Sequence, residues 1–215
     1  MSHKCQICHM KTTPLYDPQL SLYYDVCDNC GFIYKQTQYQ VNEKNEKATY
    51  DQHQNTFEST GYVNMFESFI EAFIEPVEGL KKGLEFGSGP GPVLYELLKR
   101  KGYDMMHYDP FYHPDMTYQT KAFDFITTTE VAEHFAHPIE EFEHLKSLLK
   151  PGGYLFVMTS FNKYDREDFL SWWYRRDNTH ISFYTIETFQ YIAKTTGLEI
   201  LKHNNKNVIV LKKNG

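Results

Sequence analysis

The sequence has no long apolar run, and this shortage excludes one class of protein. None of its stretches approaches the roughly 18–20 consecutive apolar residues that a membrane-spanning helix needs. The first five residues, Met1 to Cys5, lead into no apolar signal region. No internal repeat or low-complexity tract is present either. We therefore expect a soluble, cytoplasmic protein without a membrane partner, whose 215 residues form one domain of ordinary size and a small appendage.

An excess of positive charge is also missing. The chain has 22 Lys and Arg residues against 28 Asp and Glu residues, for a formal net charge of −6 at pH 7. Within residues 1–35, three lysines stand against three aspartates. Because binding to nucleic acid needs clustered Lys and Arg side chains against the phosphates, this balance argues against a nucleic-acid partner.

Cysteine is scarce too, and all four cysteines lie within the first 30 residues. They form two pairs, Cys5-x-x-Cys8 and Cys27-x-x-Cys30, separated by 18 residues, which is the spacing of a two-knuckle zinc site. Each pair places two thiolates on one tight turn, and two such turns complete a tetrahedral site of four sulfurs. A segment of about 35 residues builds little core, so the metal would supply folding energy. We predict a closed, structural zinc site; iron in a rubredoxin-like site is the main alternative, and two disulfides would require an oxidising compartment.

A glycine-rich turn between two short apolar segments carries the strongest functional signal. We expect a strand at Leu84–Phe86, followed by the turn with Gly87, Gly89 and Gly91. An amphipathic helix at Pro92–Arg100 and a second strand at Met105–Tyr108 come next, and Asp109 directly follows the second strand. Glycines let backbone amides approach a ligand closely, and the helix after them directs its positive end towards that ligand. A carboxylate at the tip of the next strand can accept hydrogen bonds from the hydroxyls of a ribose. The unit therefore predicts a pocket for a nucleoside cofactor.

The residues around this turn discriminate between cofactors. A nicotinamide fingerprint requires a glycine where this chain has Pro92. Glu85 precedes the first glycine by two residues, and the pattern E-x-G-x-G-x-G resembles motif I of the class I S-adenosylmethionine-dependent methyltransferases. A carboxylate beside the turn suits a cationic cofactor and opposes a pyrophosphate. The resemblance implies that the ribose is held by Asp109, with the neighbouring Pro110, and that the methionine and ribose parts are bound by Glu85, Gly87, Ser88, Gly89 and Gly91.

Later segments continue the resemblance. The series F-D-x-I, E-x-x-E-H and L-L-K-P-G-G-x-L, which begins at Phe123 and reaches Leu155, is similar to motifs IV to VI of the same family. Strands are expected at Phe123–Thr127 and Tyr154–Ser160, with a helix between them that the Lys-Pro-Gly-Gly sequence ends. This combination of motifs is more specific than the glycine turn alone.

The C-terminal segments complete the expected fold. Leu198–His203 and Asn207–Leu211 flank an Asn-Asn turn, which predicts an antiparallel hairpin. An antiparallel last strand distinguishes the methyltransferase sheet from the nicotinamide-binding one. We therefore expect an α/β protein with a three-layer, Rossmann-like methyltransferase sheet, a C-terminal antiparallel hairpin and a small N-terminal zinc ribbon. The expected organisation is a zinc ribbon at 1–35, a helical connector or cofactor lid at 36–80 and a class I methyltransferase domain at 81–215.

The connector contributes two further candidates for the cofactor site. Its apolar residues from Phe66 to Ile74 recur at helical spacing, and family helices at this position cover the cofactor cleft. Tyr50 and His53, just before that helix, are candidates to close over the methionine end; ordinary surface positions are an equal alternative.

One segment departs from the family pattern. Only 13 residues separate Asp109 from Phe123, where the family usually has a helix and another strand, and two prolines disfavour a helix there. The adenine side of the pocket is therefore expected to be short, with Phe111 or Tyr112 as candidates to stack on the adenine.

Candidates for the acceptor side follow two of the expected strands. Glu130 and His134 would be one helical turn apart, and Glu130 is expected to touch the cofactor. The element T-H-I-S-F-Y resembles one that precedes the last helix of many small-molecule methyltransferases. Arginine beside the two tryptophans suits an anionic or planar acceptor; an amphipathic helix packed on the sheet is the alternative for the aromatic residues. The catalytic candidates are His180, His134, Arg176 and Tyr184.

The resemblance implies transfer of a methyl group from S-adenosylmethionine, with S-adenosylhomocysteine as product, to a small-molecule acceptor. Aligning the nucleophile and excluding water can supply roughly 7–11 kcal/mol of the barrier, and a general base is needed only when the acceptor carries a proton. The alternatives are an RNA or protein methyltransferase that uses the ribbon for recognition, and a cofactor-binding scaffold without catalysis.

Overall fold

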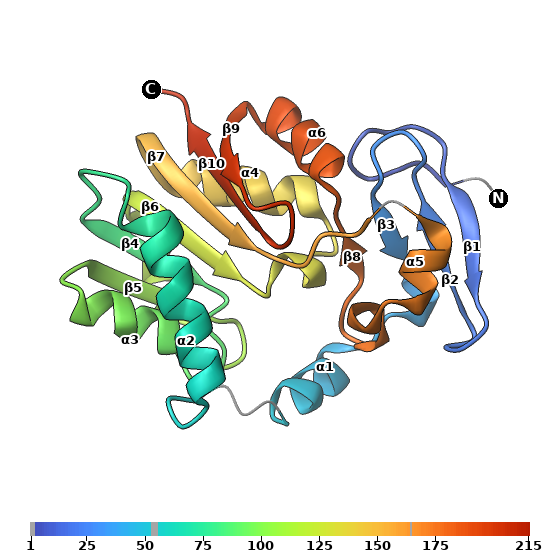
Figure 1. Cartoon of the computed structure of the whole chain (residues 1–215), viewed down its shortest axis with the longest axis horizontal. Coiled ribbons are helices and arrows are strands. Elements are labelled where there is room, and N and C mark those ends of the chain that lie inside the picture. Colours follow the sequence, from blue (N-terminus) through green and yellow to red (C-terminus); the bar gives the residue numbers. More distant parts are fainter. Residues whose placement is uncertain (1–2, 53–55, 164) are drawn as a thin grey trace.

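Two β-sheets organise the chain in the computed structural model, which describes residues 3–52, 56–163 and 165–215 (Figure 1). The larger sheet has the order β5-β4-β6-β7-β10-β9. Its strands are β4 (Lys82–Phe86), β5 (Asp104–Tyr108), β6 (Phe123–Thr129), β7 (Leu149–Met158), β9 (Leu198–His203) and β10 (Val208–Lys213). β4 is parallel to β5 and β6, and β6 is parallel to β7, whereas β10 is antiparallel to both β7 and β9. This topology confirms the predicted Rossmann-like sheet with an antiparallel C-terminal hairpin.

Helices cover both faces of this sheet (Figure 1). One face carries α2 (Thr60–Phe69), which continues as a π-helix over Ile70–Ile74, and α3 (Val93–Arg100). The other face carries α4 (Pro138–Leu148) and α6 (Ile186–Thr196). The apolar side chains of each pair of helices are buried against the strands, which gives the predicted three layers.

The smaller sheet has the order β1-β2-β3-β8 and contains the ribbon. β1 (Thr13–Asp17), β2 (Leu22–Val26) and β3 (Ile33–Lys35) are antiparallel neighbours, and β8 (Ser182–Phe183) adds a strand from the C-terminal half of the chain. The sequence did not predict β8. Because its backbone pairs with β3, the ribbon and the larger domain share a sheet.

Side-chain packing also joins the ribbon to the rest of the chain. Cys30 and Phe32 belong to the same buried core as Phe189 of α6. On the other face of the ribbon, Tyr24 packs against Phe169, with ring centroids 4.9 Å apart. The ribbon is therefore held from both sides.

Short helices and turns connect these elements. The α-helices are α1 (Glu43–Tyr50) and α5 (Arg166–Ser171), and 3-10 helices span Thr37–Tyr39, Met116–Thr120, Ala132–His134 and Trp173–Arg176. The segment 110–122 contains only a 3-10 helix, as its prolines predicted. The expectation that Glu130 and His134 share an α-helix is wrong, because Glu130 has a left-handed backbone with φ 54°. Within the described ranges, no helix has both the length and the apolar character that crossing a bilayer requires.

Candidate active site and metal centre

A cavity of about 650 Å³ lies at the carboxyl ends of β4, β5 and β6. The loops that follow these three strands supply most of its lining, and α1, α2, α4 and the segment 173–180 supply the rest. In open α/β sheets, ligands bind outside the carboxyl ends of the strands. The volume is also within the roughly 300–1,000 Å³ of small-molecule sites.

The glycine turn forms one end of this cavity. Gly87 and Gly89 have φ values of +85° and +65°, which side chains disfavour. A Cβ atom on Gly87 would lie 2.3 Å from Cγ2 of Val131, whereas a Cβ on Gly89 would meet no atom within 4 Å. Gly87 is therefore required for packing, and Gly89 leaves room beside the backbone for a ligand. Of the other residues predicted to bind the cofactor in this region, Ser88 and Pro110 also line the cavity, whereas Gly91 does not.

Two predicted carboxylates face the same end and also order the protein around them. Glu85 accepts a hydrogen bond from the backbone N–H of Tyr95 at 2.9 Å, which satisfies a free amide in the first turn of α3. Asp109 accepts one from Gly89 N at 2.8 Å and another from Phe111 N at 2.9 Å. Burial, with a smaller contribution from Asp109, raises the pKa of Glu85 to about 8. A cationic ligand at this end would favour the ionised form of Glu85.

The whole cavity is acidic. Seven carboxylate side chains line it, and among the described residues no lysine or arginine does. This distribution differs from the one expected at an anionic acceptor. Arg175 is buried against Asp17 of the ribbon, and Arg176 is exposed outside the cavity. The structure therefore places neither arginine on the wall of the cavity, which the sequence analysis did not anticipate.

A cluster of acidic and hydroxyl groups forms the other end of the cavity. The hydroxyl of Tyr174 lies 2.5 Å from Oε1 of Glu133 and 3.2 Å from Oε2 of Glu130. Thr159 donates a hydrogen bond to Oε2 of Glu133 at 2.8 Å. The pKa values of Glu130 and Glu133 are both raised above the ordinary value of a glutamate, mainly because the two side chains are buried. Strained backbone at Glu130 is the kind of feature that clusters at functional sites.

Two of the predicted histidines adjoin this cluster. Nδ1 of His134 lies 3.0 Å from the carbonyl oxygen of Thr179, and Nδ1 of His180 lies 2.8 Å from that of Tyr174. Nε2 of His180 is 3.9 Å from Oε1 of Glu133. Burial, reinforced by the neighbouring His134, lowers the pKa of His180 far below its ordinary value. This environment therefore favours the neutral imidazole of His180.

Helix α1 closes one side of the cavity. The ring of Tyr50 lies 5.3 Å from that of His134 and 5.8 Å from that of Phe111, measured between centroids. Tyr112, another candidate for adenine stacking, donates a hydrogen bond from its hydroxyl to Asp51 at 2.6 Å. Tyr50 thus lies between His134, beside the acidic cluster, and Phe111, in the loop that follows β5. His53, its predicted companion, lies outside the described residues.

Some residues were placed differently from the prediction or were missed. Tyr184 is fully buried in the core and donates its hydroxyl to the carbonyl of Ala132, so it does not line the cavity. Sequence reasoning did not select Tyr174 or Glu133 as the centre of the acidic cluster, and it missed Tyr62 of α2 on the cavity wall. The E-x-x-E-H pattern was the available signal for Glu133. Nothing in the local sequence identified Tyr174.

The four cysteines converge in the ribbon. Their Sγ atoms all lie within 4.8 Å of one another, with Cys5 to Cys30 at 3.6 Å and Cys8 to Cys27 at 3.4 Å. Sulfurs bound to one zinc at about 2.3 Å in a tetrahedron are about 3.8 Å apart. None of the four forms a disulfide. The geometry and the chemistry of this donor set fit a tetrahedral metal site without an open position.

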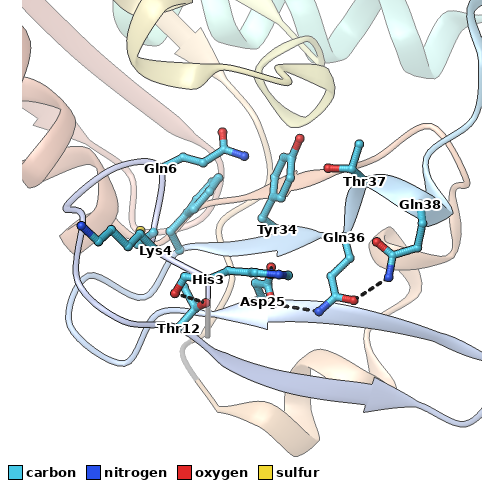
Figure 2. Close-up of a pocket in the computed structure, with 11 residues that line it drawn as sticks. His3, Lys4, Gln6, Thr12, Asp25, Tyr34, Gln36, Thr37 and Gln38 are labelled. Atoms are coloured by element: carbon cyan, nitrogen blue, oxygen red, sulfur yellow. Dashed lines mark hydrogen bonds and ion pairs between the residues drawn. The ribbon is translucent and has the colours of Figure 1, made fainter. Parts of the chain in front are cut away.

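The ribbon also has a smaller cavity of about 340 Å³ (Figure 2). Asp25 accepts a hydrogen bond from Gln36 at 2.9 Å and lies 2.6 Å from Nδ1 of His3. Gln38 donates a hydrogen bond to Gln36 at 3.0 Å. Because these polar groups bind one another, we assign no ligand to this cavity.

Comparisons with known proteins agree with the fold. The profile of the family described as "Methyltransferase domain" matches residues 63–203. An O-methyltransferase family protein from Burkholderia thailandensis is 13% identical with a TM-score of 0.51, and the match covers 79% of this chain and 63% of that one. This chain thus spans less than two thirds of that protein.

Two other solved structures are similar over most of their length. A S-adenosylmethionine-dependent methyltransferase from Archaeoglobus fulgidus is 17% identical with a TM-score of 0.51, covering 70% of this chain and 94% of that one. A putative methyltransferase from Bacillus halodurans is 11% identical with a TM-score of 0.50, covering 72% and 100%. No curated protein sequence matches the chain significantly. At these identities the structural likeness concerns the fold alone.

Proposed function

The chain belongs to the methyltransferase-domain family and is an S-adenosylmethionine-dependent methyltransferase, and from this premise we propose that it methylates a small-molecule acceptor inside the acidic cavity. One observation carries the proposal: the glycine turn and the Glu130–Glu133 pair line the same cavity of about 650 Å³. A cofactor at the first end and an acceptor at the second would be neighbours. Adjacency and alignment are the main requirements of an in-line displacement.

The cofactor end would be formed by the residues that resemble motif I. When bound, S-adenosylmethionine supplies a methyl group on a sulfonium, which leaves as a neutral thioether. The backbone beside Gly89 is open to the methionine part, and the carboxylate of Asp109 is at the strand tip where ribose hydroxyls bind in related folds. Glu85 offsets the positive charge of the cofactor. Phe111 and Tyr112 both line the cavity, which supports a role for their rings beside the adenine.

The acceptor end would be formed by Glu130, Glu133 and the two histidines. A carboxylate of the pair can accept the proton that an acceptor loses on methylation. The lack of lysine and arginine among the described lining residues supports an uncharged or cationic acceptor. It argues against RNA, whose phosphates are bound by such side chains.

Calorimetry with S-adenosylhomocysteine tests the cofactor end. We expect binding that Asp109→Asn weakens about tenfold or more, because a charged acceptor of hydrogen bonds is lost. Asp104→Asn, an exposed aspartate at the opposite end of β5, should bind as wild type does. Absence of binding by the wild-type protein would overturn the proposal.

Transfer of a labelled methyl group from S-adenosylmethionine into fractions of a cell extract tests the acceptor end. Label in the small-metabolite fraction is the expected outcome. Label confined to RNA or to protein would contradict a small-molecule acceptor and favour a macromolecular one.

In the same proposal, Cys5, Cys8, Cys27 and Cys30 hold a structural zinc ion. Their sulfur separations and their burial, with Cys27 and Cys30 at 0% exposed, support a closed site. Such a site needs reduced thiolates, which supports a reducing compartment such as the cytoplasm. Elemental analysis should find one zinc ion per chain; iron in its place, or no metal with two disulfides, would contradict the assignment.

A further inference from the structure

We propose that Glu133, His134 and His180 bind a divalent transition-metal cation at the acceptor end of the cavity. This site is separate from the four cysteines and has a different donor set. The inference rests on the proposed function only in identifying this end of the cavity with the acceptor.

The three side chains converge from segments far apart in the sequence. Glu133 and His134 belong to the 3-10 helix after β6, and His180 precedes β8. One ligand atom from each residue lies within 4.8 Å of the others. The 3.9 Å between Nε2 of His180 and Oε1 of Glu133 is within the roughly 4.2 Å that two ligands can span across one cation with bonds of about 2.1 Å. Small side-chain adjustments would bring the three ligand atoms onto one ion.

Backbone carbonyls orient both imidazoles for this role. A carbonyl oxygen only accepts hydrogen bonds, so Nδ1 of His134, facing Thr179, and Nδ1 of His180, facing Tyr174, must carry the proton. The lone pair of each ring is then on Nε2. Histidines that bind metals usually donate their other ring N–H to a carbonyl or carboxylate in this way.

The acidic cluster has no cationic side chain among the described residues that line the cavity. Tyr174 has one hydroxyl proton, yet its oxygen is within hydrogen-bonding distance of both Glu130 and Glu133. Thr159 supplies a second donor to Glu133. No lysine or arginine among the described residues lines the cavity to offset these carboxylates. A bound cation would pair with these carboxylates, whose burial as unpaired ions is costly.

The donor set favours a transition metal such as manganese, iron, cobalt or zinc over magnesium, because two of the three ligands are imidazoles. Three protein ligands leave coordination positions for an acceptor oxygen. A hydroxyl bound there would lose its proton more readily. The proton would pass to Glu130, the acceptor oxygen would bond to the methyl carbon, and the carbon–sulfur bond would break to give the thioether. The proposal thus favours a hydroxyl-bearing acceptor.

Manganese(II) is a suitable probe because four thiolates prefer zinc, so a single equivalent of zinc would occupy the proposed ribbon site. Equilibrium dialysis against manganese of wild-type protein loaded with one equivalent of zinc, followed by elemental analysis, should give about one manganese ion per chain. We expect His134→Gln and His180→Gln each to weaken this binding about tenfold or more. His137→Gln replaces an exposed histidine three residues from His134 and should bind manganese as wild type does.

The outcomes separate this inference from the proposed function. S-adenosylhomocysteine binding, measured on the same samples, reports whether each variant is folded and whether the cofactor site exists. Wild-type protein that binds S-adenosylhomocysteine but takes up no manganese would overturn the metal site and leave the proposed function intact. Equal manganese uptake by wild type and both folded variants would also overturn it, because that uptake would then depend on carboxylates alone. The wild-type stoichiometry remains decisive if a variant does not fold.

Discussion

Arg175 and Asp17 form a buried ion pair between the wall of the cavity and the ribbon, with 3.2 Å between Nε and Oδ2 and exposed fractions of 1% and 0%. Asp17 ends β1 of the ribbon. Arg175 directly follows Tyr174, whose hydroxyl contacts Glu130 and Glu133. The ion pair therefore links the position of Tyr174 to the ribbon, so an ordered acidic cluster depends on an intact ribbon.

Asp17→Asn should strongly destabilise the protein. The change leaves the shape of the side chain almost unaltered but leaves the buried guanidinium of Arg175 without its counter-charge. Breaking one partner of a buried pair costs about 3–5 kcal/mol of unfolding free energy, which urea denaturation would measure. Asp28→Asn is the matched control, because the Asp28–Arg166 pair also joins the ribbon to α5 but is exposed, at 61% and 43%. There we expect a loss of about 0–1 kcal/mol. Equal losses would show that burial does not distinguish the two pairs.

Loss of the proposed ribbon zinc should impair the cavity as well as the ribbon. Cys30 shares a core with Phe189 of α6, and its carbonyl oxygen accepts a hydrogen bond from Thr188 at 2.7 Å. Cys30→Ser should therefore remove zinc, lower the melting temperature and weaken S-adenosylhomocysteine binding together. His9→Asn replaces a nearby exposed residue with φ 60° by one that tolerates this backbone, and should keep its zinc. Unchanged cofactor binding in zinc-free Cys30→Ser would contradict the coupling.

Local motifs could be predicted from the sequence, and long-range partners could not. The glycine turn, the cysteine knuckles and the C-terminal hairpin each depend on residues close in the chain, whose backbone chemistry is specific. The contact of Tyr174 with Glu133 joins residues 41 positions apart, and that of Asp17 with Arg175 joins the N-terminal ribbon to the C-terminal half of the chain. Such pairs are set by how the ribbon docks. No local pattern distinguished Arg175, which faces the ribbon, from an arginine that faces an acceptor.

Stability of the cofactor-free protein should fall as pH rises from about 4.5 to about 8, partly because of Glu85. Its pKa is raised from 4.5 to about 8, chiefly by burial. In this window the unfolded chain has released a proton that the folded protein still holds, so increasing pH favours unfolding. Glu85→Gln keeps an acceptor for the N–H of Tyr95 but has no charge. We expect it to be more stable than wild type at pH 8.5, by roughly a few kcal/mol, and to differ little at pH 5.

Urea denaturation at a series of pH values measures this difference. Glu96→Gln, which removes a part-exposed glutamate from the same helix α3, is the control and should follow the wild-type pH dependence. A Glu85→Gln curve parallel to that of wild type at every pH would rule out Glu85 as the source.

Two glycine-to-alanine changes should have opposite effects on the free energy of unfolding. Gly87→Ala places a side chain at φ +85° and 2.3 Å from Cγ2 of Val131, so we expect a loss of at least about 2 kcal/mol in unfolding free energy. Gly61→Ala lies in α2 with no atom within 4 Å of the added Cβ, and should gain up to about 1 kcal/mol because alanine favours the helix.

A third variant separates the two causes at Gly87. In Gly87→Ala/Val131→Ala the two shortest contacts are removed, and the backbone strain and a contact of 3.2 Å with the Cβ of residue 131 remain, so the double variant should lose less than the sum of the two single changes. Urea denaturation of the four proteins measures this coupling. Strict additivity would show that Val131 does not limit the turn, and that the glycine is needed there for its backbone conformation alone.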